Sequence, residues 1–237
     1  MNKRLLFIWF VLLGCTQIYA QENKETATQV VSHAQWSINH SYRVYQIALG
    51  LNDMDAAKGA LLEILVEIPK NDSILFDLAS IYFQTQNYVS AATCAQEVLK
   101  SMPNHLGALE ISAISYENIG VNDRAVSSYE KLYLNTDDYA TLYKTTLLQY
   151  DLKRYNEALV NVDILLSRKE SDEAKLPLIT TGNEQKEYII RVVLLNLKGM
   201  IKLELGDKVA AEKSFKEAIA LAPDFAGAVE NLQALKK

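Results

Sequence analysis

Residues 192–225 read VVLLNLKGMIKLELGDKVAAEKSFKEAIALAPDF, and this stretch decides the fold. Apolar residues recur at helical spacing in both of its halves, and Pro223 stands where the second half ends. Proline cannot continue a helix, so this position indicates a helix end. The stretch therefore predicts two helices that pack as a hairpin. The residues that would shape their contact are Leu195, Gly199, Ala211, Phe215 and Ala218.

The spacing of this stretch recurs upstream. Ala57, Ala91 and Ala125 are 34 residues apart, and Ala158 follows after 33. The same 34-residue interval separates Pro69, Pro103 and Asp137, all at expected helix ends. A fixed period of this length is the signature of a repeat architecture, in which each unit is one supersecondary element.

The period and its residues resemble the tetratricopeptide repeat family, whose units are 34-residue helix–turn–helix hairpins. The matching residues outside 192–225 are Leu75, Leu78, Ala79, Tyr82, Tyr88, Ala91, Val98 and Pro103; Leu109, Ala113, Tyr116, Ala125, Tyr129 and Leu132; and Leu142, Tyr155, Ala158, Val162 and Leu165. Three places depart from the family pattern. Thr146 replaces a small residue, and Gln149 and Lys202 replace an aromatic one. The resemblance covers about residues 39–225.

The resemblance implies an all-α fold, a right-handed superhelical stack of hairpins. Small residues let the two helices of a hairpin approach, and units stack because a single hairpin leaves an apolar face in water. The expected units are a degenerate one within residues 21–71, tetratricopeptide units at 72–105, 106–139, 140–172 and 192–225, and a capping helix at 226–237. Residues 173–191 interrupt the period. We expect a loop there, either functional or merely solvated, before a longer first helix in the final unit.

The first twenty residues have the layout of a secretory signal peptide. Lys3 and Arg4 precede the apolar run Leu5–Leu13, and Ala20 offers a small residue for cleavage. The run is shorter than the roughly 20 apolar residues that span a membrane. The alternative is a lipidation motif ending at Cys15, which would give an envelope lipoprotein and the only expected membrane contact. We expect an exported, periplasmic protein in the first case.

The composition argues against polyanionic partners. Removing Lys3 and Arg4 with the signal lowers the basic total from 24 to 22 against 29 acidic residues, which gives a net charge of −7. No Lys/Arg-rich block occurs in the sequence, so nucleic acid is not an expected partner. Cleavage after Ala20 leaves Cys94 alone, and no intrachain disulfide can form.

Catalytic motifs are missing from the sequence. His33 and His40 could share a helix face, but no Cys, Asp or Glu has a companion spacing for a metal, and His105 stands alone. Paired acids of the type that glycosidases use occur at Asp137, Asp138, Glu170, Asp172 and Glu173, where loops or helix ends are expected. We therefore predict no catalytic residue, no metal and no cofactor, and read these acids as solvated charges.

The resemblance implies that the first helix of each hairpin lines a concave surface. The sixteen outward positions transferred from the family contain no Lys or Arg, which argues against clamping of a peptide carboxylate. Aromatic residues with polar edges remain, as in a groove for a peptide or helix. The candidate binding residues are Phe76, Phe83, Glu110, Ile114, Glu117, Asn118, Tyr143, Tyr150, Asn196 and Met200. The alternative is that several of them pack against neighbouring helices.

These observations predict a non-catalytic protein–protein interaction scaffold in the cell envelope, which binds a peptide or helix of another protein. A small-ligand or glycan receptor is the alternative function, because aromatic faces also stack on sugars. Self-association through the end repeats is a further possibility that the sequence leaves open.

Overall fold

The computed structural model describes residues 33–179 and 185–235. The predicted signal peptide and the lipidation site at Cys15 lie outside these residues. The chain divides into two compact units, and the boundary in the sequence lies between Asn87 and Tyr88. Within the described residues, no helix combines the length and the apolarity that crossing a membrane requires.

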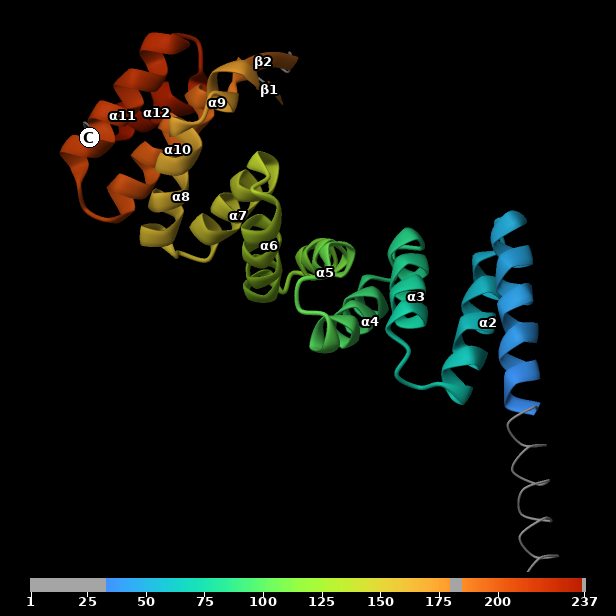
Figure 1. Cartoon of the computed structure of the whole chain (residues 1–237). Helices are drawn as coiled ribbons and strands as arrows, with labels where there is room; N and C mark the ends of the chain where they lie inside the picture. Colours follow the sequence, from blue (N-terminus) through green and yellow to red (C-terminus); the bar gives the residue numbers. More distant parts are fainter. Residues whose placement is uncertain (1–32, 180–184, 236–237) are drawn as a thin grey trace, which may run out of the picture. The chain divides into compact units, whose positions relative to one another are not determined.

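The first unit contains a helix over residues 33–50, followed by α2 (Met54–Glu67) and α3 (Asp72–Gln84) (Figure 1). The first helix and α2 are joined by a 2.7 Å hydrogen bond from Ser41 Oγ to Glu63 Oε2. Asp53 and Asn71 cap α2 and α3, since their side chains accept hydrogen bonds from the first-turn amides. The degenerate repeat expected within residues 21–71 is thus a helical hairpin.

The second unit contains a series of hairpins (Figure 1). Its long helices are α4 (Tyr88–Ser101), α5 (Leu106–Asn118), α6 (Asn122–Thr136), α7 (Tyr139–Asp151), α8 (Tyr155–Ser167), α10 (Ile190–Glu204), α11 (Lys208–Leu221) and α12 (Ala226–Leu235). Fully buried alanines at positions 91, 125, 158 and 211 recur on the second helix of successive repeats. The stacked-hairpin fold predicted from the period is confirmed.

The turn inside each hairpin repeats its backbone geometry. A residue with positive φ recurs at Asn52, Gln86, Gly120, Lys153 and Gly206, with the spacing of the repeats. In all five turns, the amide of the following residue donates to the carbonyl five residues earlier, as Val121 N donates to Tyr116 O at 2.8 Å. This bond satisfies a carbonyl at the helix end, so each first helix stops at the same place.

The insertion contains regular structure, and the expectation of a loop over residues 173–191 is wrong. After the short α9 (Glu170–Glu173), strands β1 (Lys175–Ile179) and β2 (Gln185–Ile189) pair antiparallel, with Lys175 opposite Ile189. The next helix, α10, has 15 residues, against 13 in α3, α5 and α7.

The hairpin folds because its apolar side chains have a core to join. Leu176 and Leu178 are two residues apart and therefore share a face of β1. They pack against neighbouring clusters of the last repeats, and Tyr188 of β2 is buried in one of them. Pro177 lacks an amide hydrogen but is tolerated, because a two-stranded sheet has only edge strands.

The capping helix α12 closes the last repeat. Ala228 is fully buried, and Phe225 at the start of this segment meets the Tyr188 ring edge-on at 5.1 Å between centroids. Asn231 of α12 donates a 2.9 Å hydrogen bond to Asn196 of α10. The insertion and the cap therefore share one core with the final hairpin.

Candidate functional site

The predicted concave-face residues of the first unit lie on α3. Phe76 and Phe83 are seven positions apart, which is two turns of one helix face, and both are half-buried. Between them, Ser80 Oγ donates a 2.9 Å hydrogen bond back to the Phe76 carbonyl.

On α5, the predicted residues divide between packing and solvent. Glu117 accepts a 2.9 Å hydrogen bond from the Tyr129 hydroxyl of α6 and forms a 2.6 Å ion pair with Lys144 of α7. Burial, followed by this bond to Glu117, raises the pKa of Tyr129. Ile114 packs against the core. Glu110 and Asn118 are exposed, and Asn118 bonds the Ile114 carbonyl.

The two predicted tyrosines of α7 pack against different clusters. Tyr143 contacts the cluster around Leu142 and Leu165, whereas Tyr150 contacts the one around Val162 and lies 5.7 Å from the Tyr155 ring. Both rings are half-buried, and burial raises the pKa of each hydroxyl. A large part of each ring is therefore used to hold neighbouring helices.

On α10, Asn196 is engaged by the capping helix through Asn231, and its own amide approaches Met200 Sδ at 3.6 Å. In the second unit, the predicted residues thus include partners of neighbouring helices as well as solvent-facing groups. That the concave-face residues of α3, α5, α7 and α10 bind a ligand stays a prediction.

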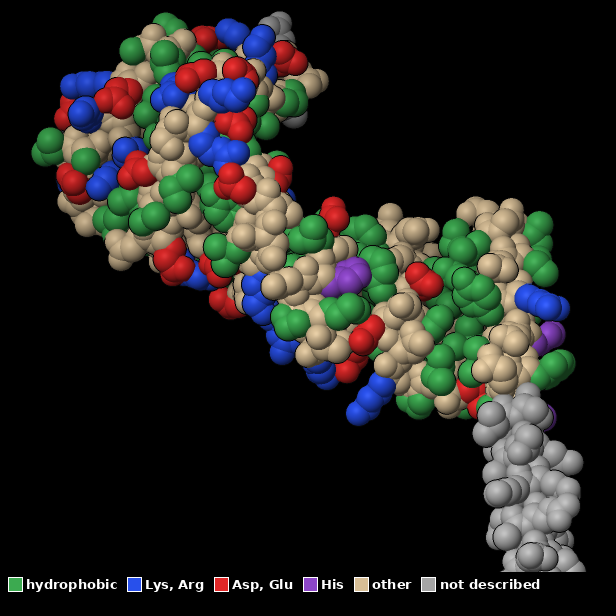
Figure 2. All heavy atoms as spheres, viewed as in Figure 1, with side chains coloured by type: hydrophobic (Ala, Val, Ile, Leu, Met, Phe, Trp, Pro, Cys, Tyr) green, Lys and Arg blue, Asp and Glu red, His purple; other side chains and the backbone are tan. Residues whose placement is uncertain are grey.

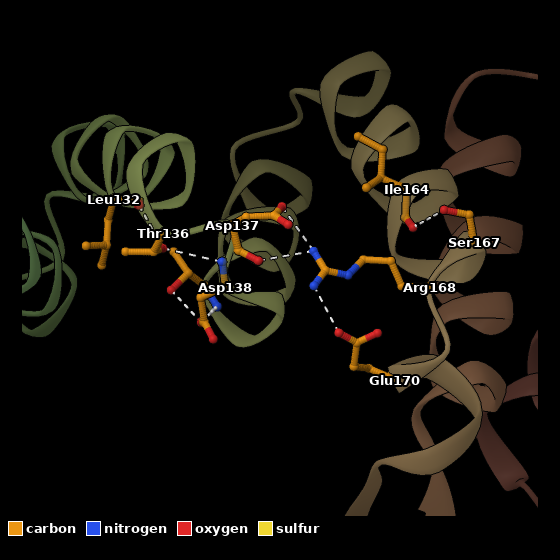
Figure 3. A network of polar contacts seen from close by, with 9 residues as sticks. Leu132, Thr136, Asp137, Asp138, Ile164, Ser167, Arg168 and Glu170 are labelled. Atoms are coloured by element: carbon orange, nitrogen blue, oxygen red, sulfur yellow. Dashed lines mark hydrogen bonds and ion pairs between the residues drawn. The ribbon is translucent and has the colours of Figure 1, made fainter.

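Three of the acidic residues considered as catalytic candidates, Asp137, Asp138 and Glu170, have structural partners (Figure 3). Arg168 Nη1 lies 3.1 Å from Asp137 Oδ1, and its Nη2 lies 2.9 Å from Glu170 Oε1. Asp138 caps α7 by accepting from the Thr141 amide at 2.7 Å. The bond to Arg168 lowers the pKa of Glu170, whereas a general acid needs a raised pKa.

The histidines are likewise engaged with nearby groups. His40 stacks on Trp36 with 5.2 Å between ring centroids, and His105 Nδ1 accepts the Ala108 amide at the start of α5. No group of three His, Cys, Asp or Glu residues in the described part of the chain could hold a metal ion. On the face drawn in Figure 2, the basic side chains over the C-terminal repeats lie among acidic ones.

A groove that the sequence analysis missed lies on α6, α7 and α8 and has a volume of about 580 Å³. Leu134 and Val160 form part of its walls and are 81% and 59% exposed. Such exposed apolar side chains are ordinary when single, but here they line one depression. The groove is lined by Glu130, Tyr133, Leu134, Leu142, Thr145, Gln149, Asn156, Glu157, Val160 and Asn161, none of which is a predicted site residue.

Gln149 forms the polar floor of this groove. Its side chain is 2% exposed, donates to Glu130 Oε1 at 2.9 Å and accepts from Asn161 Nδ2 at 2.8 Å. Arg154 reaches the same Glu130 oxygen at 2.9 Å and also bonds Glu157. The departure of Gln149 from the repeat pattern is the sequence signal that could have found this groove.

Comparisons with known proteins agree with this architecture. Residues 192–225 match the family model described as a tetratricopeptide repeat. These 34 residues are therefore a tetratricopeptide repeat. No curated protein matches the chain.

Solved repeat structures match over most of the chain. A MamA structure aligns with a TM-score of 0.54 at 15% identity and covers 80% of this chain and 94% of its own. MamA from Desulfovibrio magneticus aligns with a TM-score of 0.51 at 15% identity, over 80% and 97%. YrrB, described as a TPR protein with an unusual peptide-binding site, aligns at 0.56 and 11% identity, over 82% and 89%. At these identities, the matches show that this chain shares their fold.

Proposed function

We propose that this tetratricopeptide repeat protein is a non-catalytic scaffold that binds a segment of another protein. The observation that carries the proposal is the open groove on α6, α7 and α8, whose walls expose Leu134 and Val160. A repeat stack offers such surfaces without a lid or a closed cavity, which suits an extended or helical segment. The peptide-binding site of YrrB, a protein of similar fold, supports the same class of function.

The predicted concave face is the second place where a partner could bind. Its candidate residues in the second unit that keep exposed side chains are Glu110 and Asn118, while Tyr143 and Tyr150 offer part of each ring. The groove on α6, α7 and α8 is favoured as the binding place, because its apolar walls are not used by the hairpin core.

We further propose that the protein works outside the cytoplasm, from the charged and apolar pattern of residues 1–20. Mass spectrometry of the protein purified from its own host tests this placement. A mature chain that begins at Gln21 supports cleavage, and a lipid-modified Cys15 supports the envelope-anchored alternative. A chain that retains Met1 contradicts both.

A crosslinked pull-down from envelope extract tests the binding proposal with two matched variants. Phe83→Ala/Tyr150→Ala removes rings from the predicted concave face, and Leu134→Lys/Val160→Ser changes the exposed walls of the groove. Far-UV circular dichroism establishes that each variant keeps its helices.

We expect one protein to be enriched by the wild type and lost from the groove variant. Loss from the concave-face variant alone would move the site to the first helices. Enrichment of no protein by the wild type would contradict the scaffold proposal and favour the glycan-binding alternative, which a glycan array then checks.

A further inference from the structure

The second unit contains the groove twice, in successive repeats. A smaller depression of about 200 Å³ lies on α4, α5 and α6, one repeat earlier. Eight of its nine lining residues stand 33 or 34 positions before lining residues of the larger groove. The pairs are Gln96 and Glu130, Leu99 and Tyr133, Lys100 and Leu134, Leu109 and Leu142, Tyr116 and Gln149, Arg124 and Glu157, Ser127 and Val160, and Ser128 and Asn161. The earlier depression therefore shows which side chains occupy the equivalent space in the preceding repeat.

In the earlier depression, the place is filled by the ring of Tyr116. This side chain is 6% exposed, accepts a 3.1 Å hydrogen bond from Arg124 Nη1 and has the guanidinium 5.4 Å from its ring centroid. In the next repeat, Gln149 stands at the equivalent position and brings no ring. The larger groove thus lacks an aromatic group that the preceding repeat supplies from within.

The rims of the two depressions also differ. Lys100 and Ser127 of the earlier one are replaced by Leu134 and Val160, so the larger groove has apolar walls where the smaller one has polar walls. An apolar side chain placed between these walls would remove their exposed surface from water, which is favourable in proportion to the area buried.

The charge of the two linings has opposite sign. Among their described lining residues, the earlier depression has Lys100, Arg124 and Lys131 and no acid, whereas the larger groove has Glu130 and Glu157 and no base. Arg154, beside the groove, pairs with both glutamates. Two carboxylates share one guanidinium, which leaves the larger groove complementary to a cation.

From the missing ring, the apolar walls and the two glutamates, we infer that this groove accepts an aromatic side chain of a partner protein with a Lys or Arg beside it. The inference rests on the proposed scaffold function and names the kind of segment that the scaffold recognises. The ring takes the place that Tyr116 fills one repeat earlier, and the basic neighbour lies against Glu130 and Glu157.

The polar floor suits an aromatic side chain that carries a hydroxyl. The Gln149 amide has two N–H groups and uses one for Glu130, so the second can donate to a phenolic oxygen. Aromatic side chains bury a large area with few rotatable bonds, which is why they dominate small binding sites. Tyrosine is therefore the favoured ring.

A displayed library of random peptides, selected on the full mature protein, tests this inference. Two variants remove the groove in different ways. Gln149→Tyr restores the ring from within, and Leu134→Lys/Val160→Ser gives the walls the residues of the earlier repeat. Val209→Lys is the matched control, because Val209 is 81% exposed like Leu134 but lies on α11.

We expect enriched peptides to contain an aromatic residue within two positions of Lys or Arg. Their affinity, measured by fluorescence polarisation, should fall at least about tenfold when the aromatic residue is changed to Ala or when either groove variant is used. It should be unchanged by Val209→Lys and should weaken as salt is raised. Should Gln149→Tyr fail to fold, the pair of surface substitutions still decides the result.

Equal binding by wild type and groove variants would overturn the inference while leaving the scaffold proposal intact. Enriched peptides without aromatic residues would do the same. If no peptide is enriched on the wild type, the inference fails, and the pull-down from envelope extract decides separately whether the scaffold proposal also fails.

Discussion

The close approach of α10 and α11 depends on Gly199. A Cβ atom built at this position would lie 2.5 Å from Cδ1 and 2.9 Å from Cζ of Phe215, and closer still to Cε1. Phe215 is fully buried, so its ring has no solvent to move into. We expect Gly199→Ala to push the two helices apart and destabilise the last repeat.

The expected magnitude follows from two opposing terms. Ordinary contacts of a Cβ atom lie at 3.4–4 Å, so the ring must retreat by about 1 Å. Overpacking of this kind costs about 1–3 kcal/mol. Replacing glycine by alanine inside a helix stabilises the helix by about 0.5–1 kcal/mol. The packing term is larger, and the net loss in free energy of unfolding should be about 1–2 kcal/mol.

Urea unfolding followed by far-UV circular dichroism measures this loss. Gly59→Ala on α2 is the matched control, because a Cβ there meets nothing within 4 Å. It should stabilise the first unit by about 0.5–1 kcal/mol. The double variant Gly199→Ala/Phe215→Leu should be more stable than the two single losses predict, since the smaller side chain makes room for the methyl group. A Gly199→Ala protein as stable as the wild type would refute the reasoning.

Three further outcomes can be checked. Tyr139→Phe should raise the free energy of unfolding by about 1 kcal/mol in urea titrations, because the buried Tyr139 hydroxyl has no hydrogen-bond partner among the described residues and its pKa is raised to about 12. Cys94 should react with a thiol reagent more slowly than a cysteine peptide near pH 8, because burial, followed by Glu97, raises the pKa of its thiol. Arg191 lowers the pKa of Asp172 below its ordinary 3.8, so the stability from this pair is present above that value and lost as the pH falls through the lowered pKa. The unfolding midpoint of Asp172→Asn should therefore fall less than that of the wild type between about pH 5 and about pH 2.

Much of the fold could be predicted because its determinants are local and repeated. The interval between Ala57, Ala91 and Ala125 fixes the hairpin period, and each of these alanines is fully buried. The insertion could not be read in the same way. Pro177 and the polar run at residues 180–187 indicate a loop. The strands form because Leu178 and Tyr188 meet a core built by the helices that follow the insertion.

The candidate site, too, could be predicted from the sequence only in part. Position within a first helix was predictable from the repeat, but the use of each side chain was not. Glu117 looked like a rim residue and instead bonds Tyr129 and Lys144 of the next two helices. Tyr143 and Tyr150 were predicted to line a binding groove, but much of each ring packs against neighbouring helices.

The sequence by itself determined that this protein is a stack of tetratricopeptide hairpins, because small and large residues recur at the period that helix packing requires. It also marked Gln149 as a departure from that pattern. Only the tertiary structure decided what the departure does. A missing ring becomes a groove when helices of adjacent repeats are held apart around it, and Leu134 and Val160 come to share that groove from separate helices. Periodicity is a property of one chain segment, whereas a cavity depends on side chains that the fold brings together.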